Sequence, residues 1–242
     1  MKYFGISRFC ILIMLLSFFS LNAQTSAGII KYKHTIFIEF ENMPADMPKS
    51  SETFTRLLFN GPESLYEKDQ DIRTDVNEND NTPRMFRRMR TNQNKITYKN
   101  LEKGSTIESL NLFGKDFLIT DSLVNYKWKI SASEQKVIAG YTCMKASFKD
   151  SLSNIVVFFT PQIPKKFGPD NYGNLPGIIL EVQSAQTHII ATSVKLETPE
   201  IKVPSKGDKM TRKEFEKLRE EKTKEMRQMW GQRGGETRVI RQ

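Results

Sequence analysis

Apolar and polar residues alternate along much of the chain, and this period of two is the pattern of a β-strand with one buried and one solvated face. The longest example runs from Ile30 to Phe40, with Ile30, Tyr32, His34, Ile36, Ile38 and Phe40 on one face. Further strands are indicated at Thr53–Phe59, Ser64–Glu67, Lys95–Tyr98, Ile107–Phe113, Phe117–Ile119, Val124–Ile130, Val137–Phe148, Ile155–Phe159, Ile178–Val182 and His188–Leu196. About ten short strands separated by turn signals predict a mainly β fold: an antiparallel meander forming a large curved sheet, a half-barrel or a barrel.

A loop rich in proline and glycine, from Thr160 to Val182, interrupts this pattern. Its special residues are Pro161, Pro164, Pro169, Pro176, Gly168, Gly173 and Gly177. Because proline fixes φ and glycine reaches backbone conformations closed to other residues, the path of this loop is largely determined. Aromatic residues on a rigid loop can form a contact surface. The candidate binding residues are Phe167, Tyr172, Asn174, Leu175, Pro176 and Gly177.

Two interpretations of Leu175-Pro176-Gly177 stay open at this point. In the first, the three residues form a turn, in which Gly177 has a positive φ or lies against another backbone and Leu175 is buried as its anchor. In the second, their side chains face outward as a recognition surface. The aromatic residues of the loop have the same two interpretations. They can form an exposed contact surface, or they can pack on the sheet and fix the loop to it.

The C-terminal residues differ from the rest, because from Lys202 onward they include thirteen basic and seven acidic side chains. Thr211 followed by Glu214 is a capping box, which predicts a helix from Thr211 to about Trp230 that ends at Gly231. This helix has few apolar residues among its charged ones. We therefore expect it to pack only weakly on the β domain and to contribute little to the core. The sequence thus predicts a signal peptide at 1–23, an antiparallel β domain at 24–200 and a basic charged helical tail at 201–242.

Residues 1–23 have the pattern of a secretory signal peptide, with Lys2 and Arg8 at a basic start, an apolar run, and the small residue Ala23 before the cleavage point. We therefore expect a periplasmic or otherwise extracytoplasmic protein with no membrane span after cleavage. The mature chain then keeps one cysteine, Cys143, which excludes an intramolecular disulfide.

The net charge of +9 does not indicate binding to nucleic acid, because most of it lies in the tail. Between Gln24 and Ile201 the chain has 22 basic and 21 acidic residues, so this body is close to neutral. Together with export, this distribution predicts no nucleic-acid partner.

Conventional catalytic chemistry has few candidates in this sequence. Cys143, His34 and His188 each share a strand face with apolar residues, which favours core positions over a Cys–His pair. Asp75 and the asparagines after it resemble the start of a calcium loop, but the glycine and the bidentate glutamate of such a loop are missing. We therefore expect no enzymatic activity, no metal site and no cofactor.

A wider set of residues carries a family resemblance. The set is Trp128, Lys136, Ile138, Gly140-Tyr141, Cys143, Lys145-Ala146, Thr160, Ile163-Pro164, Gly168-Pro169 and Asn174-Leu175-Pro176-Gly177-Ile178-Ile179. It resembles the GLPGLI family, secreted proteins of Bacteroidetes-type bacteria whose function is not established. Asn174 stands where that family usually has its first glycine, and asparagine is the next best residue at positive φ. The family has no agreed catalytic residues, so the resemblance implies export and assigns no active site.

Two functions follow as expectations. The first is an exported, non-enzymatic binding or interaction module, whose partner is an unknown periplasmic or outer-membrane protein and whose contact surface is the proline loop. The alternative is a periplasmic carrier of a lipid-like or hydrophobic ligand on the curved sheet. A carrier predicts an apolar cavity too large for side chains to fill, whereas an interaction module predicts a filled core.

Overall fold

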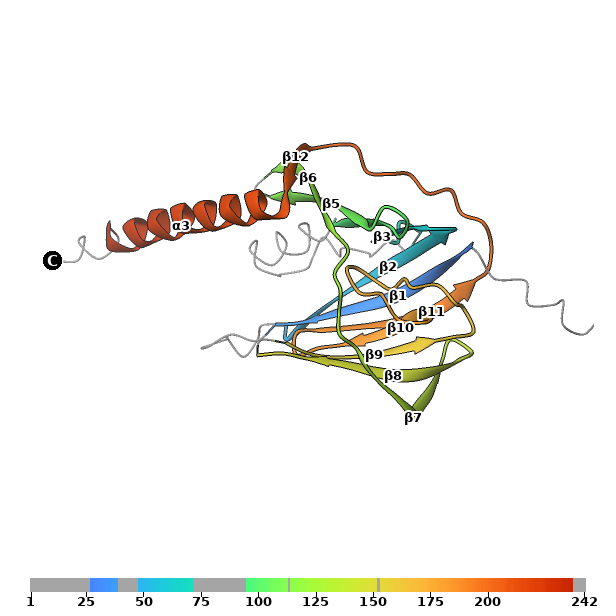
Figure 1. The fold of residues 1–242 in the computed structure, drawn as a ribbon. Helices are drawn as coiled ribbons and strands as arrows, with labels where there is room; N and C mark the ends of the chain where they lie inside the picture. The colour runs from blue at the N-terminus through green and yellow to red at the C-terminus, as the bar shows by residue number, and fades with distance from the viewer. Residues whose placement is uncertain (1–26, 39–47, 72–94, 113, 152, 237–242) are drawn as a thin grey trace, which may run out of the picture.

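The computed structural model describes residues 27–38, 48–71, 95–112, 114–151 and 153–236, which form one curved sheet of twelve strands and one helix (Figure 1). The strands are β1 (Ala27–Phe37), β2 (Ser50–Asn60), β3 (Glu63–Lys68), β4 (Ile96–Asn100), β5 (Ser105–Leu112), β6 (Lys115–Ser122), β7 (Lys129–Ile138), β8 (Tyr141–Lys149), β9 (Asn154–Thr160), β10 (Ile178–Gln183), β11 (Thr187–Lys195) and β12 (Asp208–Thr211), and the helix is α3 (Arg212–Glu236). The predicted signal peptide lies outside the described residues, and so does the segment from Asp75 that resembles the start of a calcium-binding loop.

The sheet consists of two meanders joined at its centre. Its strand order is β12-β6-β5-β4-β3-β2-β1-β11-β10-β9-β8-β7, so β1 and β11 form the central pair. Neighbouring strands are antiparallel throughout the described sheet, except that β12 runs parallel to β6. The predicted mainly β fold is confirmed as a large curved sheet, and the alternative of a closed barrel is wrong. β12 was not expected, because its four residues alternate too briefly to be recognised.

A short connection bridges the two ends of the sheet. β6 and β7 lie near opposite ends of the strand order, yet only residues 123–128 join them. Since an extended residue spans at most about 3.6 Å, so short a segment can reach only where the sheet curves back on itself. This segment, which we call the strap, crosses the open side of the curve (Figure 1). The strand expected from Val124 is therefore wrong up to Trp128, because the alternating pattern there belongs to an extended crossing segment.

The next expected strand, Val137–Phe148, is in fact a hairpin. β7 ends at Ile138 and β8 begins at Tyr141. Between them Ala139 and Gly140 have φ values of 48° and 85°, the left-handed conformations that a two-residue hairpin turn requires. Alanine rarely adopts this conformation, so the sequence signal for the turn is weak.

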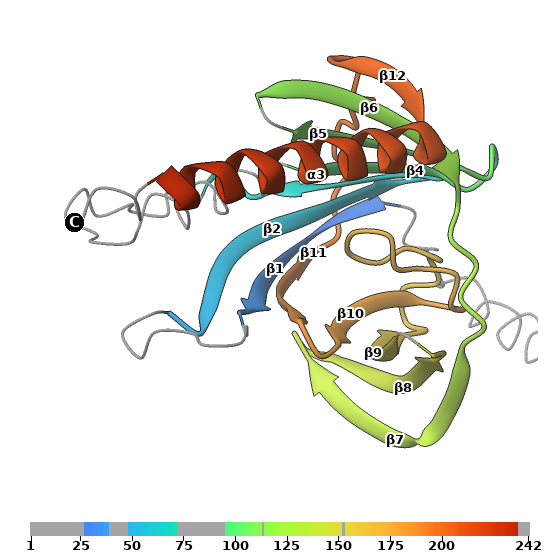
Figure 2. The ribbon, with the colours of Figure 1, turned by 90° about the vertical axis from the view of Figure 1, so that its left-hand side faces the viewer.

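The main core lies on the concave side of the sheet. Residues 161–177 of the proline loop lie inside the curve (Figure 2). Their buried side chains Ile163, Phe167 and Leu175 belong to the same apolar cluster as Tyr32 of β1 and Phe59 of β2. The Tyr32 hydroxyl also donates a hydrogen bond of 2.7 Å to the carbonyl of Ile179. The loop therefore fills the concave side as part of the core.

The C-terminal helix begins where expected and ends later. The Thr211 backbone N–H donates to Glu214 Oε2 at 2.7 Å, and the Glu214 N–H donates to Thr211 Oγ1 at 3.3 Å, which confirms the capping box. Phe215 packs edge-on against Phe117 of β6, with ring centroids 5.8 Å apart. The expected end at Gly231 is wrong, because the helix continues to Glu236 and projects away from the sheet (Figure 1). Among the described residues, no helix has the length and apolar character to cross a membrane.

Candidate functional site

One part of the proline loop, residues 174–179, is built for packing. Leu175 is 1% exposed, and Ile178 and Ile179 are fully buried. A Cβ atom on Gly177 would lie 2.2 Å from the carbonyl oxygen of Thr160, so only glycine fits there. Of the two interpretations of Leu175-Pro176-Gly177, the structure shows the first: Gly177 lies against the backbone of Thr160, and Leu175 is buried. We call residues 174–179 the loop anchor.

The six candidate binding residues divide by exposure. Phe167, Leu175 and Gly177 are buried, whereas Tyr172 is half-buried. Asn174 and Pro176 are exposed. Asn174 has a φ of 65°, and its side-chain amide donates a hydrogen bond of 2.8 Å to Asn125 of the strap. A ligand can therefore reach Tyr172, Asn174 and Pro176 while the loop keeps this conformation.

A second part of the loop, residues 170–172, is polar, and we call it the loop apex. Asp170 has a φ of 47°, in the left-handed region that non-glycine residues rarely occupy. Its Oδ1 lies 2.7 Å from Lys95 Nζ and accepts a hydrogen bond of 3.0 Å from Thr97 Oγ1. Burial alone raises the pKa of the Asp170 carboxyl, but the Lys95 ammonium overcomes this and holds that pKa below its ordinary value. Such strained residues cluster at functional sites.

The carboxylate of Glu108 connects the loop apex to the helix. Its side chain is 2% exposed. Glu108 Oε1 accepts from Asn171 Nδ2 at 2.7 Å and lies 2.6 Å from Arg212 Nη2, at the first residue of α3. Glu108 Oε2 lies 3.3 Å from Lys95 Nζ. One buried carboxylate thus holds together β5, the loop and the start of the helix.

Lys99 supports the apex from below. It is buried, and its Nζ donates to the backbone carbonyls of Gly168 at 3.0 Å and Tyr172 at 2.6 Å. Burial lowers the pKa of the Lys99 ammonium to about 7, although the nearby Asp170 carboxylate opposes this shift. Thr97 pairs with Glu108 and Lys99 with Thr106, so β4 and β5 direct these polar side chains to the same face of the sheet. The apex cluster consists of Lys95, Lys99, Glu108, Asp170, Asn171 and Arg212.

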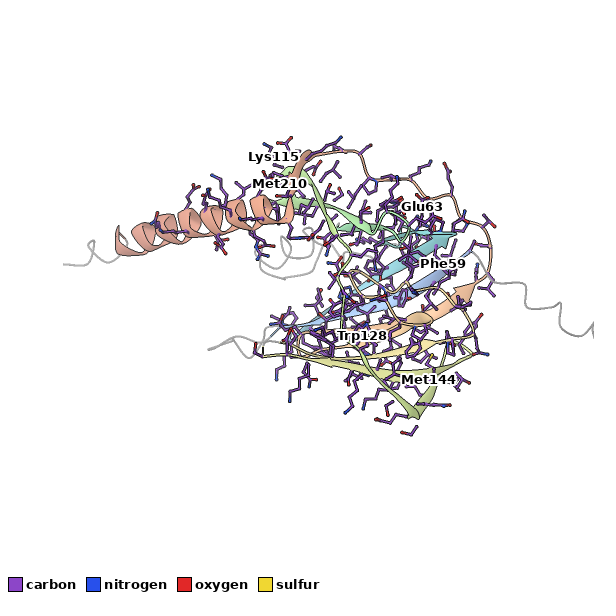
Figure 3. All side chains as sticks on the ribbon, in the orientation of Figure 1. Phe59, Glu63, Lys115, Trp128, Met144 and Met210 are labelled. Carbon is purple, nitrogen blue, oxygen red and sulfur yellow. The ribbon has the colours of Figure 1, made fainter. Side chains whose placement is uncertain are left out.

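Aromatic rings adjoin the cluster through Tyr172. The ring of Tyr172 stacks on that of Tyr126, with centroids 5.7 Å apart and an interplanar angle of 24°. Tyr126 also lies 4.9 Å from Trp128, which contacts Phe148 edge-on at 6.3 Å. Trp128 Nε1 donates to the carbonyl of Gly173 at 2.9 Å and so ties the strap to the loop. Figure 3 labels Trp128 at the end of the strap. Tyr126, Trp128, Phe148 and Tyr172 form an aromatic stack of half-buried rings.

The cysteine and the two histidines lie in different surroundings. Cys143 is buried, and burial raises the pKa of its thiol to about 11. His34 lies 3.5 Å from the Tyr66 hydroxyl, and burial lowers the pKa of His34, opposed in part by Asp170. His188 Nε2 lies 2.8 Å from Glu181 Oε1. A protonated thiol is a poor nucleophile, so the geometry gives Cys143 no activation.

The apex cluster was not predicted from the sequence. Its charges come from segments distant in the chain, since 63 positions separate Glu108 from Asn171 and 73 separate Thr97 from Asp170. One signal was present: β4 and β5 carry polar residues on both faces, including Lys99 and Glu108 on the face turned to the loop. Charged and polar side chains on a strand face that another segment covers indicate a buried polar network or a site.

One segment of this chain, which includes the proline loop, matches the model of a protein family. A family model described as "Protein of unknown function (Porph_ging)" matches residues 149–181, which include β9 and the whole loop up to β10. No curated protein matches the chain.

Two solved structures of PNGF-II, from two different space groups, share the fold. The first has a TM-score of 0.54 at 14% sequence identity, over 80% of this chain and 33% of that one. The second has a TM-score of 0.51 at 16% identity, over 79% and 32%. The chain thus spans about one third of the length of PNGF-II, and at this identity the likeness shows the fold alone.

Proposed function

We propose that this protein is an exported, non-enzymatic binding module that holds its ligand or partner where the apex cluster meets the aromatic stack. The observation that carries this proposal is the tripeptide Asp170-Asn171-Tyr172, whose side chains reach Lys95, Glu108 and Tyr126 in turn. Non-enzymatic function is supported by the buried, protonated thiol of Cys143, and export by the pattern of residues 1–23.

The site is open at its rim and rigid at its base. Lys95 is 31% exposed, and Asp170 and Arg212 are each 30% exposed. Beneath them Lys99 and Glu108 are buried and fixed by hydrogen bonds or ion pairs. Pre-organised polar groups with partial access are the usual features of a binding site, because little ordering remains to be done when a ligand arrives.

The carrier of a lipid-like or hydrophobic ligand is the second candidate, since the sheet is curved and open. Phe167 and Leu175 occupy the concave side and pack against Tyr32 and Phe59, where a carrier would hold its ligand. Their burial favours the binding module over the carrier. The resemblance to the GLPGLI family agrees with either function, because it implies export and no particular ligand.

Native mass spectrometry of protein purified from its own periplasm tests the proposal. We expect an N-terminus at Gln24 and a retained ligand or partner that Tyr172→Ala loses and Lys166→Ala keeps; Lys166 is an exposed residue of the same loop. Retention of a lipid by all three proteins would favour the carrier instead. Purification without any retained species, or with Met1 still present in the soluble fraction, would contradict the proposed function.

A further inference from the structure

The charges of the candidate site are balanced within the site itself. Lys95 lies between Asp170 and Glu108, and Arg212 lies between Glu108 and Asp121, at 3.4 Å from Asp121 Oδ2. An ionic ligand would have to displace one of these ion pairs, which costs free energy that its own contacts must first recover. The balance therefore favours a ligand without net charge.

Several hydrogen-bonding atoms of the loop apex face no protein partner among the described residues. Both contacts of the Asp170 carboxylate use Oδ1, which leaves Oδ2 available. Asn171 uses Nδ2 on Glu108 and leaves its Oδ1 available. The hydroxyls of Tyr126 and Tyr172 stay protonated, because burial and then neighbouring groups, Asp170 among them, raise the pKa of each phenol. The site thus offers two acceptors and two hydroxyl groups to a polar ligand.

The aromatic stack supplies the complementary apolar surface. The face of an aromatic ring carries negative charge density and attracts the slightly positive hydrogens of C–H groups as well as excluding water from them. A pyranose ring has an apolar face of C–H groups and an edge of hydroxyls. Such a ring matches the half-buried ring of Tyr172, which follows Asp170 and Asn171 directly in the loop apex.

We propose that the loop apex binds a neutral carbohydrate, with the C–H face of a sugar ring against Tyr172 and its hydroxyls hydrogen-bonded to Asp170 and Asn171. This inference rests on the proposed function and names its ligand class. A cationic ligand is the nearest competitor, because aromatic faces and a carboxylate also attract cations. The Lys95 ammonium at 2.7 Å from Asp170 repels such a ligand.

The test uses the fluorescence of Trp128, which lies in the aromatic stack. The mature chain contains one other tryptophan, so the Trp230→Phe variant leaves Trp128 as the single reporter. The full mature protein is titrated with neutral oligosaccharides built on glucose, mannose, galactose and N-acetylglucosamine, and separately with choline and inorganic phosphate. We expect saturable binding of at least one neutral sugar, with an affinity that is independent of salt concentration, because screening acts only on charges.

Variants then locate the binding. Tyr172→Ala and Asp170→Asn should each weaken sugar binding at least tenfold, whereas Lys166→Ala should leave it unchanged; asparagine tolerates the positive φ of Asp170. Tyr172→Leu, which keeps an apolar side chain but removes the ring face, replaces Tyr172→Ala if the latter fails to fold. The inference would be overturned if choline or phosphate binds and no sugar does, or if no sugar in the panel binds. It would also be overturned if the affinity for a sugar is unchanged in the Tyr172 and Asp170 variants. A non-sugar ligand that is retained from the periplasm and lost in Tyr172→Ala would overturn it while leaving the proposed function standing.

Discussion

The anchor and the apex of the proline loop lie within ten residues of each other and are built on opposite principles. The anchor, residues 174–179, is apolar and fixed by burial of Leu175 and by the contact of Gly177 with the Thr160 backbone. The apex, residues 170–172, is polar, partly exposed and fixed by groups from β4, β5 and α3. A loop held firmly at one end can keep a strained residue such as Asp170 at the other, because the packing of the anchor determines its path.

The largest effect should come from the anchor. Gly177→Ala adds one methyl group at 2.2 Å from a backbone oxygen, and neither the Thr160 carbonyl nor the loop can move without breaking the β9–β10 pairing. We expect a loss of about 4 kcal/mol or more in the free energy of unfolding, or a failure to fold. Pro176→Ala, at the exposed neighbouring position, should cost less than about 1 kcal/mol. Chemical denaturation measures both, and equal costs would contradict the packing role of Gly177.

Leu175→Ala should be the next most damaging change. Leu175 is 1% exposed within the main core, so its truncation leaves a cavity and costs about 2–5 kcal/mol. Tyr172→Phe, at the apex, removes one hydroxyl and should change stability by less than about 1 kcal/mol. Near-native thermal stability of Leu175→Ala would instead return the motif to the role of a recognition surface.

The anchor was predictable from sequence and the apex was not, for a physical reason. Residues that are close together in the sequence determine the conformation of the anchor, since Pro176 and Gly177 restrict the backbone directly before an apolar strand. The capping box at Thr211 was equally local and is confirmed. The alternation of β1 holds at the buried Ile30 and Tyr32, but Thr35, which was expected on the solvated face, is buried, and Phe40 lies outside the described residues. The apex depends on charges such as Lys95 and Arg212 that meet Asp170 and Glu108 only through the fold. The same limit explains β12, whose pairing with β6 is a tertiary contact.

The C-terminal tail is expected to matter more than its composition suggests. Deletion of residues 206–242 removes β12 from the sheet edge, Phe215 from its packing on Phe117, and Arg212 from Glu108. We expect a loss of about 3 kcal/mol, chiefly from the buried phenylalanine and the weakened ion pairs. A shorter deletion of residues 223–242, which leaves these contacts in place, should be close to neutral. If both deletions leave the unfolding midpoint unchanged, the tail is independent of the β domain and its helix start does not support the apex.

Lys99 gives the apex a dependence on pH that the anchor lacks. Its pKa is about 7 in the folded protein and about 10.4 in an unfolded chain, so between these values the unfolded chain binds more protons. Stability therefore rises with pH across this window, by up to about 1.4 kcal/mol per pH unit relative to a protein without this group. The free energy of unfolding of the native chain minus that of Lys99→Met should rise by about 2 kcal/mol from pH 7 to pH 9.

Lys103→Met, which replaces an exposed lysine close in sequence, serves as the control and should show no such slope. The measurement is denaturant unfolding at several pH values with all three proteins. A flat difference between the native chain and Lys99→Met would mean that Lys99 stays charged in the fold and that the apex has no group titrating near neutrality.

Asn174 lies at the boundary between apex and anchor, and it offers the smallest and most discriminating change. Its φ of 65° suits glycine, and its amide also bonds to Asn125 of the strap at 2.8 Å. If backbone geometry is what position 174 requires, Asn174→Gly should be neutral within about 0.5 kcal/mol. Asn174→Ala should cost about 1 kcal/mol, because alanine has a Cβ atom but lacks the local side-chain hydrogen bonding that lets asparagine adopt a left-handed conformation. If the bond to the strap matters instead, both variants lose it and should cost the same amount. Because that bond is exposed to water, its net contribution is small, so the two variants should differ and thermal unfolding should place glycine close to the native chain.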